Sequence, residues 1–184
     1  MKKALVLIDI QNDYFDNGNH VLYQPEIASG NAKKILEYSR ENKIDIIHIQ
    51  HLSMNQGADF FLPDTKGAEI HKDVTPINEE KVIVKHYPNS FRDTELHQYL
   101  TEKGITELLI CGMMTDVCVA TTVRAAMDLG YTTTVIGDAC ATEDRMLYGK
   151  TIPAKQIHES YLAGLTALGN LYATVLTTQE YLDK

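Results

Sequence analysis

Three residues that together could form a nucleophile and acid–base set each stand at or shortly after the end of a short apolar run. They are Asp9, Lys85 and Cys118. A cysteine in the first turn of a helix faces unpaired N–H groups and the positive end of the helix dipole, which stabilise a thiolate. If folding brings the three side chains together, a thiol nucleophile, a carboxylate base and a charge-balancing lysine are the parts of acyl transfer.

Each of these residues also has an ordinary structural interpretation. Asp9 could accept N–H bonds in a polar loop, and Lys85 could extend along the surface to reach water. Cys118 could be an inert core thiol, an interpretation that fits Cys111 and Cys140 better. The combination favours chemistry, because nucleophilic catalysis gives all three groups one shared task.

The elements that must position these residues follow from the periodicity of apolar residues. Continuous apolar runs predict strands over 4–8, 44–49, 82–84, 108–111, 132–136 and 172–176, and amphipathic patterns predict helices over 27–41, 94–103, 115–129 and 153–168. This alternation predicts an α/β fold: a doubly wound, Rossmann-like, mostly parallel six-stranded sheet with helices on both faces. Ligands bind beyond the carboxyl ends of such strands, where all three candidate residues would meet.

Composition narrows the class of protein. The chain has 184 residues, of which 44% are apolar, and a formal net charge of −8. This size predicts one domain over residues 1–184, and the acidic balance argues against nucleic-acid or membrane partners. Three cysteines without a pairing pattern and no apolar leader predict free thiols in the cytoplasm. A small molecule is the expected partner.

Five segments in order carry a resemblance to a known family. They are residues 7–15, 66–71, 84–96, 112–124 and 130–141. With these segments the chain resembles the cysteine hydrolases of the isochorismatase-like superfamily, which includes nicotinamidase and N-carbamoylsarcosine amidohydrolase. The resemblance implies a catalytic triad of Asp9, Lys85 and Cys118 and a cis peptide between Met113 and Met114. It further implies that the N–H groups of Met114 and Cys118 form an oxyanion hole.

The resemblance implies hydrolysis of a C–N bond in a small amide or carbamoyl compound through a cysteine acyl-enzyme. Three alternatives stay open: hydrolysis of another small substrate, a redox-sensing thiol, and a small-molecule binder on the same fold. Nicotinamidases build a metal site from an Asp-x-His motif, which residues 49–55 lack, so no metal and no cofactor is expected. The family also implies a homo-oligomer, a dimer or a tetramer, with apolar residues of 148–161 as candidate interface.

Further residues are expected around this centre. Thr115 and Asp116 are expected to cap the nucleophile helix, and Arg124 to pair with Asp138. Aromatic residues on the loops after the first three strands are expected to line the substrate pocket. The pocket candidates are Phe15, His51, Phe60, Phe61 and Phe91.

Overall fold

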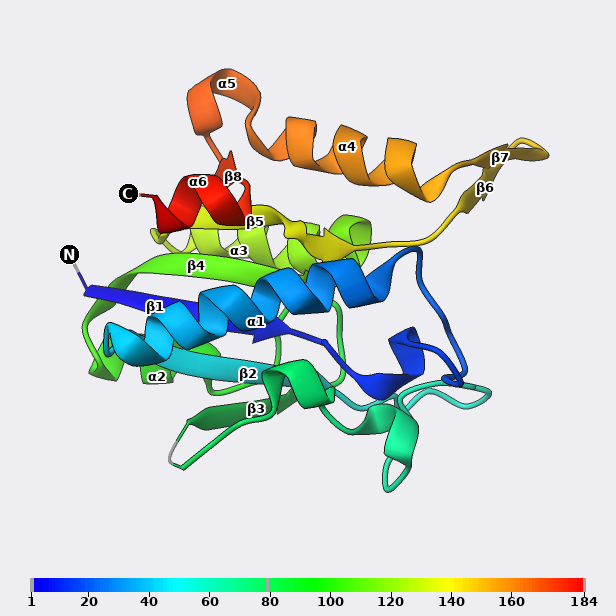
Figure 1. Cartoon of the computed structure of the whole chain (residues 1–184), viewed down its shortest axis with the longest axis horizontal. Coiled ribbons are helices and arrows are strands. Elements are labelled where there is room, and N and C mark those ends of the chain that lie inside the picture. Colours follow the sequence, from blue (N-terminus) through cyan, green and yellow to red (C-terminus); the bar gives the residue numbers. More distant parts are fainter. Residues whose placement is uncertain (1, 79, 184) are drawn as a thin grey trace.

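Six parallel strands form the sheet at the centre of the molecule. The computed structural model describes residues 2–78 and 80–183. The strands are β1 (Lys2–Ile8), β2 (Asp45–His51), β3 (Lys81–Lys85), β4 (Ile105–Met113), β5 (Thr132–Ala141) and β8 (Thr174–Leu176). They lie in the order β3-β2-β1-β4-β5-β8, and every neighbouring pair is parallel (Figure 1). The predicted doubly wound α/β fold is confirmed.

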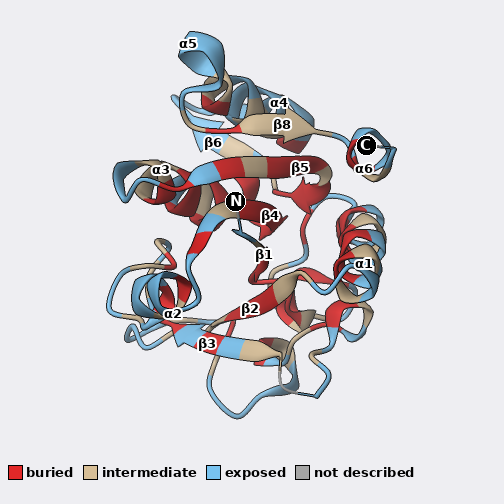
Figure 2. Ribbon diagram, turned by 90° about the vertical axis from the view of Figure 1, so that its left-hand side faces the viewer, coloured by how far each residue is buried: buried red, intermediate tan, exposed pale blue. Residues whose placement is uncertain are grey.

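Helices cover both faces of this sheet. They are α1 (Pro25–Glu41), α2 (Leu96–Glu102), α3 (Ala120–Asp128), α4 (Ala154–Leu165), α5 (Ala167–Asn170) and α6 (Thr178–Leu182). Helices α1 and α6 lie on one side of the sheet, and α2 and α3 lie on the other (Figure 2). Among the described residues, no helix is both long and apolar enough to cross a bilayer.

Shorter elements complete the chain. They are the single turns η1 (Asn12–Tyr14), η2 (Lys66–Ala68) and η3 (Lys72–Val74), the π-helical turn η4 (Thr115–Val119), and the strands β6 (Arg145–Leu147) and β7 (Lys150–Ile152). Strands β6 and β7 pair as an antiparallel hairpin that projects from the body of the molecule (Figure 1). Apart from η4, which lies within the helix predicted over 115–129, these elements were not predicted from the sequence, because their apolar patterns are too short to show a period.

Two predicted helices differ from those observed. The helix predicted over 115–129 divides into η4 and α3, because the N–H groups of Val117 and Val119 both bond to the carbonyl of Met114, at 3.1 and 3.2 Å. The second bond spans five residues and widens the turn. The helix predicted over 153–168 ends at Leu165, because Leu168 lies in the left-handed region at φ +54°.

The core has two layers, one on each face of the sheet. Along β1, Leu5 and Leu7 join the layer beneath α1, while Val6 and Ile8 join the layer beneath α2 and α3. All four side chains are buried. A strand covered on both faces must be apolar at every position, which explains the continuous apolar runs in the sequence.

The close approach of β1 and β4 depends on Gly112, near the point where strand order reverses. The chain crosses from β3 at the edge back to β4, so a crevice is expected between the carboxyl ends of β1 and β4. Gly112 pairs with Ile8 and has φ +146°, a conformation that other residues rarely adopt. A Cβ atom at this position would lie 2.2 Å from the carbonyl oxygen of Ile8.

We expect Gly112→Ala to lower the free energy of unfolding by at least about 2 kcal/mol, because the new methyl group meets rigid backbone. The matched control is Gly30→Ala in α1, where a Cβ atom has no neighbour within 4 Å. That control should stabilise the protein by about 0.5–1 kcal/mol through helix propensity. Urea unfolding followed by circular dichroism measures both changes, and equal stability of the two variants would contradict this account of the strand approach.

Candidate active site

The side chains of Asp9, Lys85 and Cys118 meet at the carboxyl edge of the sheet. Asp9 directly follows β1, Lys85 ends β3, and Cys118 lies in η4 after β4. The Lys85 Nζ atom lies 2.7 Å from Asp9 Oδ2 and donates to Cys118 Sγ at 3.3 Å. Asp9 and Lys85 are fully buried, and Cys118 is 3% exposed. The sequence therefore identified three groups that the fold brings into contact.

Opposite charges keep both members of the buried ion pair ionised. Burial by itself raises the pKa of Asp9, but the positive charge of Lys85 is the largest opposing influence, and the pKa lies below its ordinary value. Burial likewise lowers the pKa of Lys85, but Asp9 and Cys118 outweigh it and raise the pKa. Asp9 Oδ1 has no hydrogen-bond partner among the described residues. A carboxylate oxygen is thus free to accept a proton.

The thiol of Cys118 is held neutral in the resting protein. Burial raises its pKa well above the ordinary value, and the carboxylate of Asp9 adds to this effect, while Lys85 opposes it. Tyr14 is also close enough for its pKa to be raised by Cys118 and Asp9, after burial as the main cause. Burial and the Asp9 carboxylate therefore oppose the stabilisation of a thiolate that was expected from the helix start.

The turn that carries Cys118 is anchored by side chains other than the expected caps. Neither Thr115 nor Asp116 caps the turn, whose N-cap residue is Met114 and has no side-chain hydrogen bond. Asp116 instead accepts from Thr142 at 2.5 Å and from Arg145 at 2.7 Å. The capping expectation is wrong, since Thr142, just after β5, and Arg145, at the start of β6, occupy this carboxylate.

Two further contacts fix the same turn. Thr115 Oγ1 lies 2.8 Å from His158 Nδ1 on α4, and Arg145 Nη2 lies 3.4 Å from Met114 Sδ. The peptide bond between Met113 and Met114 is cis, as the resemblance implied. The sequence analysis missed His158 and Arg145, because the chain places them 43 and 31 residues from their partners.

Comparison with known proteins assigns the family. The isochorismatase domain matches residues 3–180. The chain belongs to the isochorismatase family. It is 46% identical over 182 residues to the isochorismatase family protein YddQ of Bacillus subtilis, covering 99% of each chain. An isochorismatase crystal structure from Pseudomonas putida has a TM-score of 0.89 and 34% identity, over 97% of this chain and 89% of that one. A streptothricin hydrolase of Streptomyces noursei is 33% identical over 77% of this chain and 50% of its own.

The pocket residues expected in this isochorismatase-family chain divide into two groups. His51 lies 3.6 Å from Asp9 Oδ2, and Phe61, fully buried, lies 5.8 Å from the His51 ring. The ring of Phe60 packs against that of Phe61 in a tilted arrangement, with 4.9 Å between the ring centroids, and extends this aromatic cluster. Tyr14 also packs on Phe61, at 4.6 Å, and was not predicted.

Phe15 and Phe91 lie elsewhere. Phe15 stacks on His71 at 3.7 Å, against η3, and lines a separate cavity of about 470 Å³. Phe91 stacks on Tyr131 at 5.8 Å and packs against the core layer beneath α2 and α3. Neither residue contacts Asp9, Lys85 or Cys118 in the contacts of the described chain, so their assignment to the pocket remains a prediction.

Arg124 does not pair with Asp138. Its guanidinium lies over the ring of Tyr172 at 5.0 Å and donates to the carbonyl of Ala120. Asp138 Oδ1 accepts from the backbone and hydroxyl of Thr178 at 2.7 and 2.8 Å. That expectation is wrong because a cap position at the start of α6 already occupies the carboxylate.

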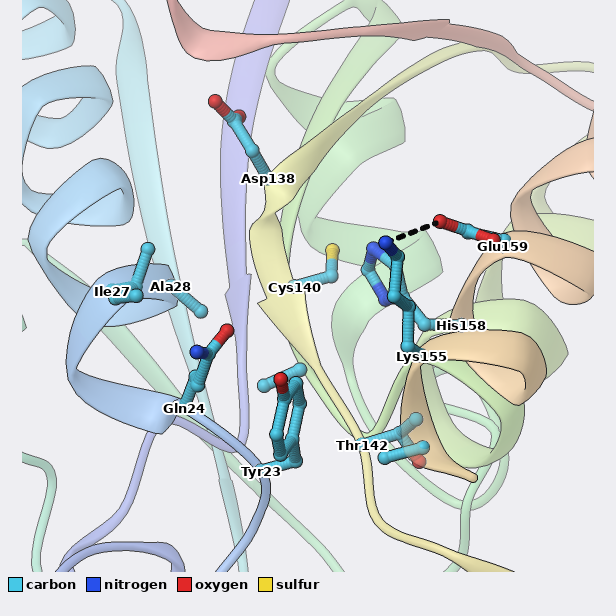
Figure 3. Close-up of a pocket in the computed structure, with 12 residues that line it drawn as sticks. Tyr23, Gln24, Ile27, Ala28, Asp138, Cys140, Thr142, Lys155, His158 and Glu159 are labelled. Atoms are coloured by element: carbon cyan, nitrogen blue, oxygen red, sulfur yellow. Dashed lines mark ion pairs between the residues drawn. The ribbon is translucent and has the colours of Figure 1, made fainter. Parts of the chain in front are cut away.

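A cavity of about 330 Å³ opens between the start of α1, the end of β5 and α4 (Figure 3). Gln24, Cys140, Thr142 and His158 are among the residues that line it. Asp9, Lys85 and Cys118 are not, as far as the described residues go. The cavity therefore lies behind the turn that carries Cys118 and touches it through Thr142 and His158.

A metal ion would have to compete with Lys85. Asp9, His51 and Cys118 present an oxygen, a nitrogen and a sulfur atom within 4.8 Å of one another, donor types that zinc accepts. The Nζ atom of Lys85 lies within 3.3 Å of all three groups. The ammonium thus supplies the positive charge at this position, and a site without metal remains our prediction.

The ion pair yields a stability prediction. We expect Lys85→Met to lower the free energy of unfolding at pH 7 by about 3–5 kcal/mol, because it leaves the carboxylate of Asp9 buried without a counter-charge. Adding Asp9→Asn should recover part of this loss. Chemical unfolding of the single and double variants measures the difference. A loss below about 1 kcal/mol for the single variant would contradict the burial of the pair.

The same pair predicts the direction of the pH dependence. The lowered pKa of Asp9 contributes stability that is complete above 3.8 and is lost as the pH falls through the folded-state pKa. The raised pKa of Lys85 contributes stability that is complete below 10.5 and is lost as the pH rises through the folded-state pKa. The double variant Lys85→Met with Asp9→Asn should lose this pH dependence of the free energy of unfolding at both the acidic and the alkaline end.

Proposed function

We propose that this isochorismatase-family hydrolase cleaves the C–N bond of a small amide or carbamoyl compound through an acyl-enzyme on Cys118. The observation that carries the proposal is the contact of one buried ammonium with both a carboxylate and a thiol. A nucleophile, a base with an unpaired oxygen and a fixed cation are what such a reaction requires.

In the first half of the reaction, Sγ of Cys118 attacks the substrate carbonyl carbon and its proton passes to Asp9. The carbonyl electrons become an oxyanion that accepts from the N–H groups of Met114 and Cys118. Collapse of this intermediate breaks the C–N bond, and Asp9 returns the proton to the leaving amine. A thioester remains on Cys118.

In the second half, water attacks the thioester carbonyl and gives a proton to Asp9. The C–S bond breaks, the proton returns to sulfur, and a carboxylic acid leaves. Lys85 stays charged throughout, and its anionic neighbour changes from Asp9 to Cys118 as the proton moves. Because burial raises the pKa of the Cys118 thiol, the thiolate forms only as its proton passes to Asp9, and it then attacks the carbonyl carbon beside the ammonium of Lys85.

The alternatives have less support. A redox-sensing thiol is typically exposed and has a lowered pKa, whereas Cys118 is buried and its pKa is raised. A passive small-molecule binder has no use for a buried ion pair beside a thiol, which is costly to desolvate. One relative is named as a hydrolase of streptothricin, which supports hydrolysis of a small molecule.

We expect Cys118→Ala to abolish turnover, and the unaltered protein to gain an acyl mass on Cys118 when it meets a reactive amide. A panel of small amides, carbamoyl compounds and lactams, read by intact mass and peptide mapping, tests this. Repeating the panel with a chelator tests the prediction that no metal is needed.

The matched control is Cys111→Ala, which removes another buried thiol in β4 and keeps the three groups in contact. It should retain turnover, with a loss of about 1 kcal/mol in stability. Turnover that survives Cys118→Ala would overturn the acyl-enzyme mechanism. All three cysteines are free thiols in the structure, which suits the proposed reducing cytoplasm.

We also propose that the protein self-associates through the β6–β7 hairpin. Met146, Leu147 and Tyr148 at this hairpin are 70%, 52% and 93% exposed, and burying such residues favours association. Changing Met146 and Tyr148 to glutamate should therefore reduce the mass measured by light scattering. Leu168→Glu in α5, at an equally exposed position (87%), is the control expected to leave the mass unchanged. An unchanged mass in the hairpin variant would exclude this interface.

A further inference from the structure

The ammonium of Lys85 has more acceptors around it than it has protons. Its Nζ atom lies 2.7 Å from Asp9 Oδ2, 3.0 Å from the carbonyl of Tyr87, 3.1 Å from His51 Nδ1 and 3.3 Å from Cys118 Sγ. A lysine ammonium carries three N–H groups. Lys85 can therefore donate a full hydrogen bond to only three of these four acceptors at any moment.

The acceptor served least at rest is the thiol. A neutral thiol is a weak acceptor, and the contact with Cys118 Sγ is the longest of the four. Once the sulfur becomes anionic, it is the strongest acceptor that lacks a full hydrogen bond from Lys85. Hydrogen bonds to charged groups are about twice as strong as those between neutral groups. One N–H of Lys85 must then leave another partner, and Asp9 and the carbonyl of Tyr87 are closer than His51.

His51 is held in place firmly enough to be the partner from which Lys85 withdraws one N–H. The backbone N–H of His51 donates to Gln11 Oε1 at 2.7 Å, and the backbone carbonyl of His51 accepts from Gln11 Nε2 at 2.9 Å. Gln11 is fully buried and also donates to the carbonyl of Ala68 at 2.8 Å. These two hydrogen bonds from the Gln11 side chain to the backbone of His51 fix the last residue of β2, where strand pairing ends.

We propose that His51 is a positioning residue that accepts one N–H of Lys85 at rest and releases it to Cys118 when the sulfur becomes anionic. This role assigns the lone pair to Nδ1 and the ring proton to Nε2, because the Lys85 ammonium, 3.1 Å from Nδ1, can only donate. No covalent bond changes in the exchange: one N–H···N hydrogen bond breaks and one N–H···S hydrogen bond forms. The side chain of His51 is 16% exposed, so water can serve Nδ1 after the release.

The exchange delays the stabilisation of the thiolate until the thiol proton has moved to Asp9. The groups that face Cys118 are Asp9 after β1, Lys85 on β3 and Tyr14 in η1. His51 on β2 faces Asp9 and Lys85. This role rests on the proposed function, but it predicts a property of the thiol that needs no substrate.

The test is the pH profile of alkylation of Cys118 by iodoacetamide, read by peptide mapping so that the two other buried thiols do not contribute. In the His51→Leu variant, three acceptors remain for the three N–H groups of Lys85. One of these groups therefore donates a full hydrogen bond to the sulfur of Cys118 at rest. We expect the midpoint of the profile to move down by about one pH unit, which is roughly tenfold faster alkylation below the midpoint. His51→Asn, whose amide oxygen can replace Nδ1, should restore the original midpoint.

The outcomes are distinct. A change in rate by the same factor at every pH, with no shift of the midpoint, would mean that His51 only shields the thiol. An upward shift would mean that His51 acts as a cation beside Lys85. Either result overturns the proposal.

If His51→Leu does not fold, Gln11→Leu provides the second route, because it removes the clamp on His51. We expect a smaller shift in the same downward direction, and no shift would contradict the role of the clamp. Failure of the proposed function is separate: it would appear as absence of acyl adducts on the unaltered protein, whatever the alkylation profile.

Discussion

The buried ion pair between Lys85 and Asp9 is the interaction on which the site depends. Charges of this kind are stable in a protein interior when each finds a partner, and here the lysine reaches from β3 across β2 to the end of β1. The same ammonium contacts the turn after β4. One side chain thereby joins the ends of β1, β2 and β3 and the thiol of Cys118 in a single electrostatic unit.

This unit would let Cys118, as the proposed nucleophile, stay protected at rest and still lose its proton during the reaction. Burial and Asp9 keep the thiol protonated, so the resting protein carries one balanced pair of charges at its centre. A proton moved from sulfur to Asp9 leaves the number of charges unchanged. Only their positions change, and the fixed ammonium is in contact with both positions.

The sequence predicted the fold and the three central residues well, because strands buried on both faces are continuously apolar and residues at their carboxyl ends must meet. It could not predict the neutral thiol, since burial of Cys118 depends on packing of distant segments. Nor could it predict the partners of Asp116 and Arg124, because several possible partners compete for each charged group and tertiary distances decide between them. The contact between His51 and Lys85 depends on pairing of β2 with β3, which local patterns do not reveal.

Strand β3 forms one edge of the sheet, where open backbone groups can recruit a strand from another molecule. Val82 and Val84 on this strand are partly exposed, so its outer surface favours such pairing. Lys85 fixes the end of the strand to Asp9 and thereby holds its register against β2. The ion pair at the centre of the site therefore also fixes the end of an edge strand, which opposes a shift of that strand toward pairing with another molecule.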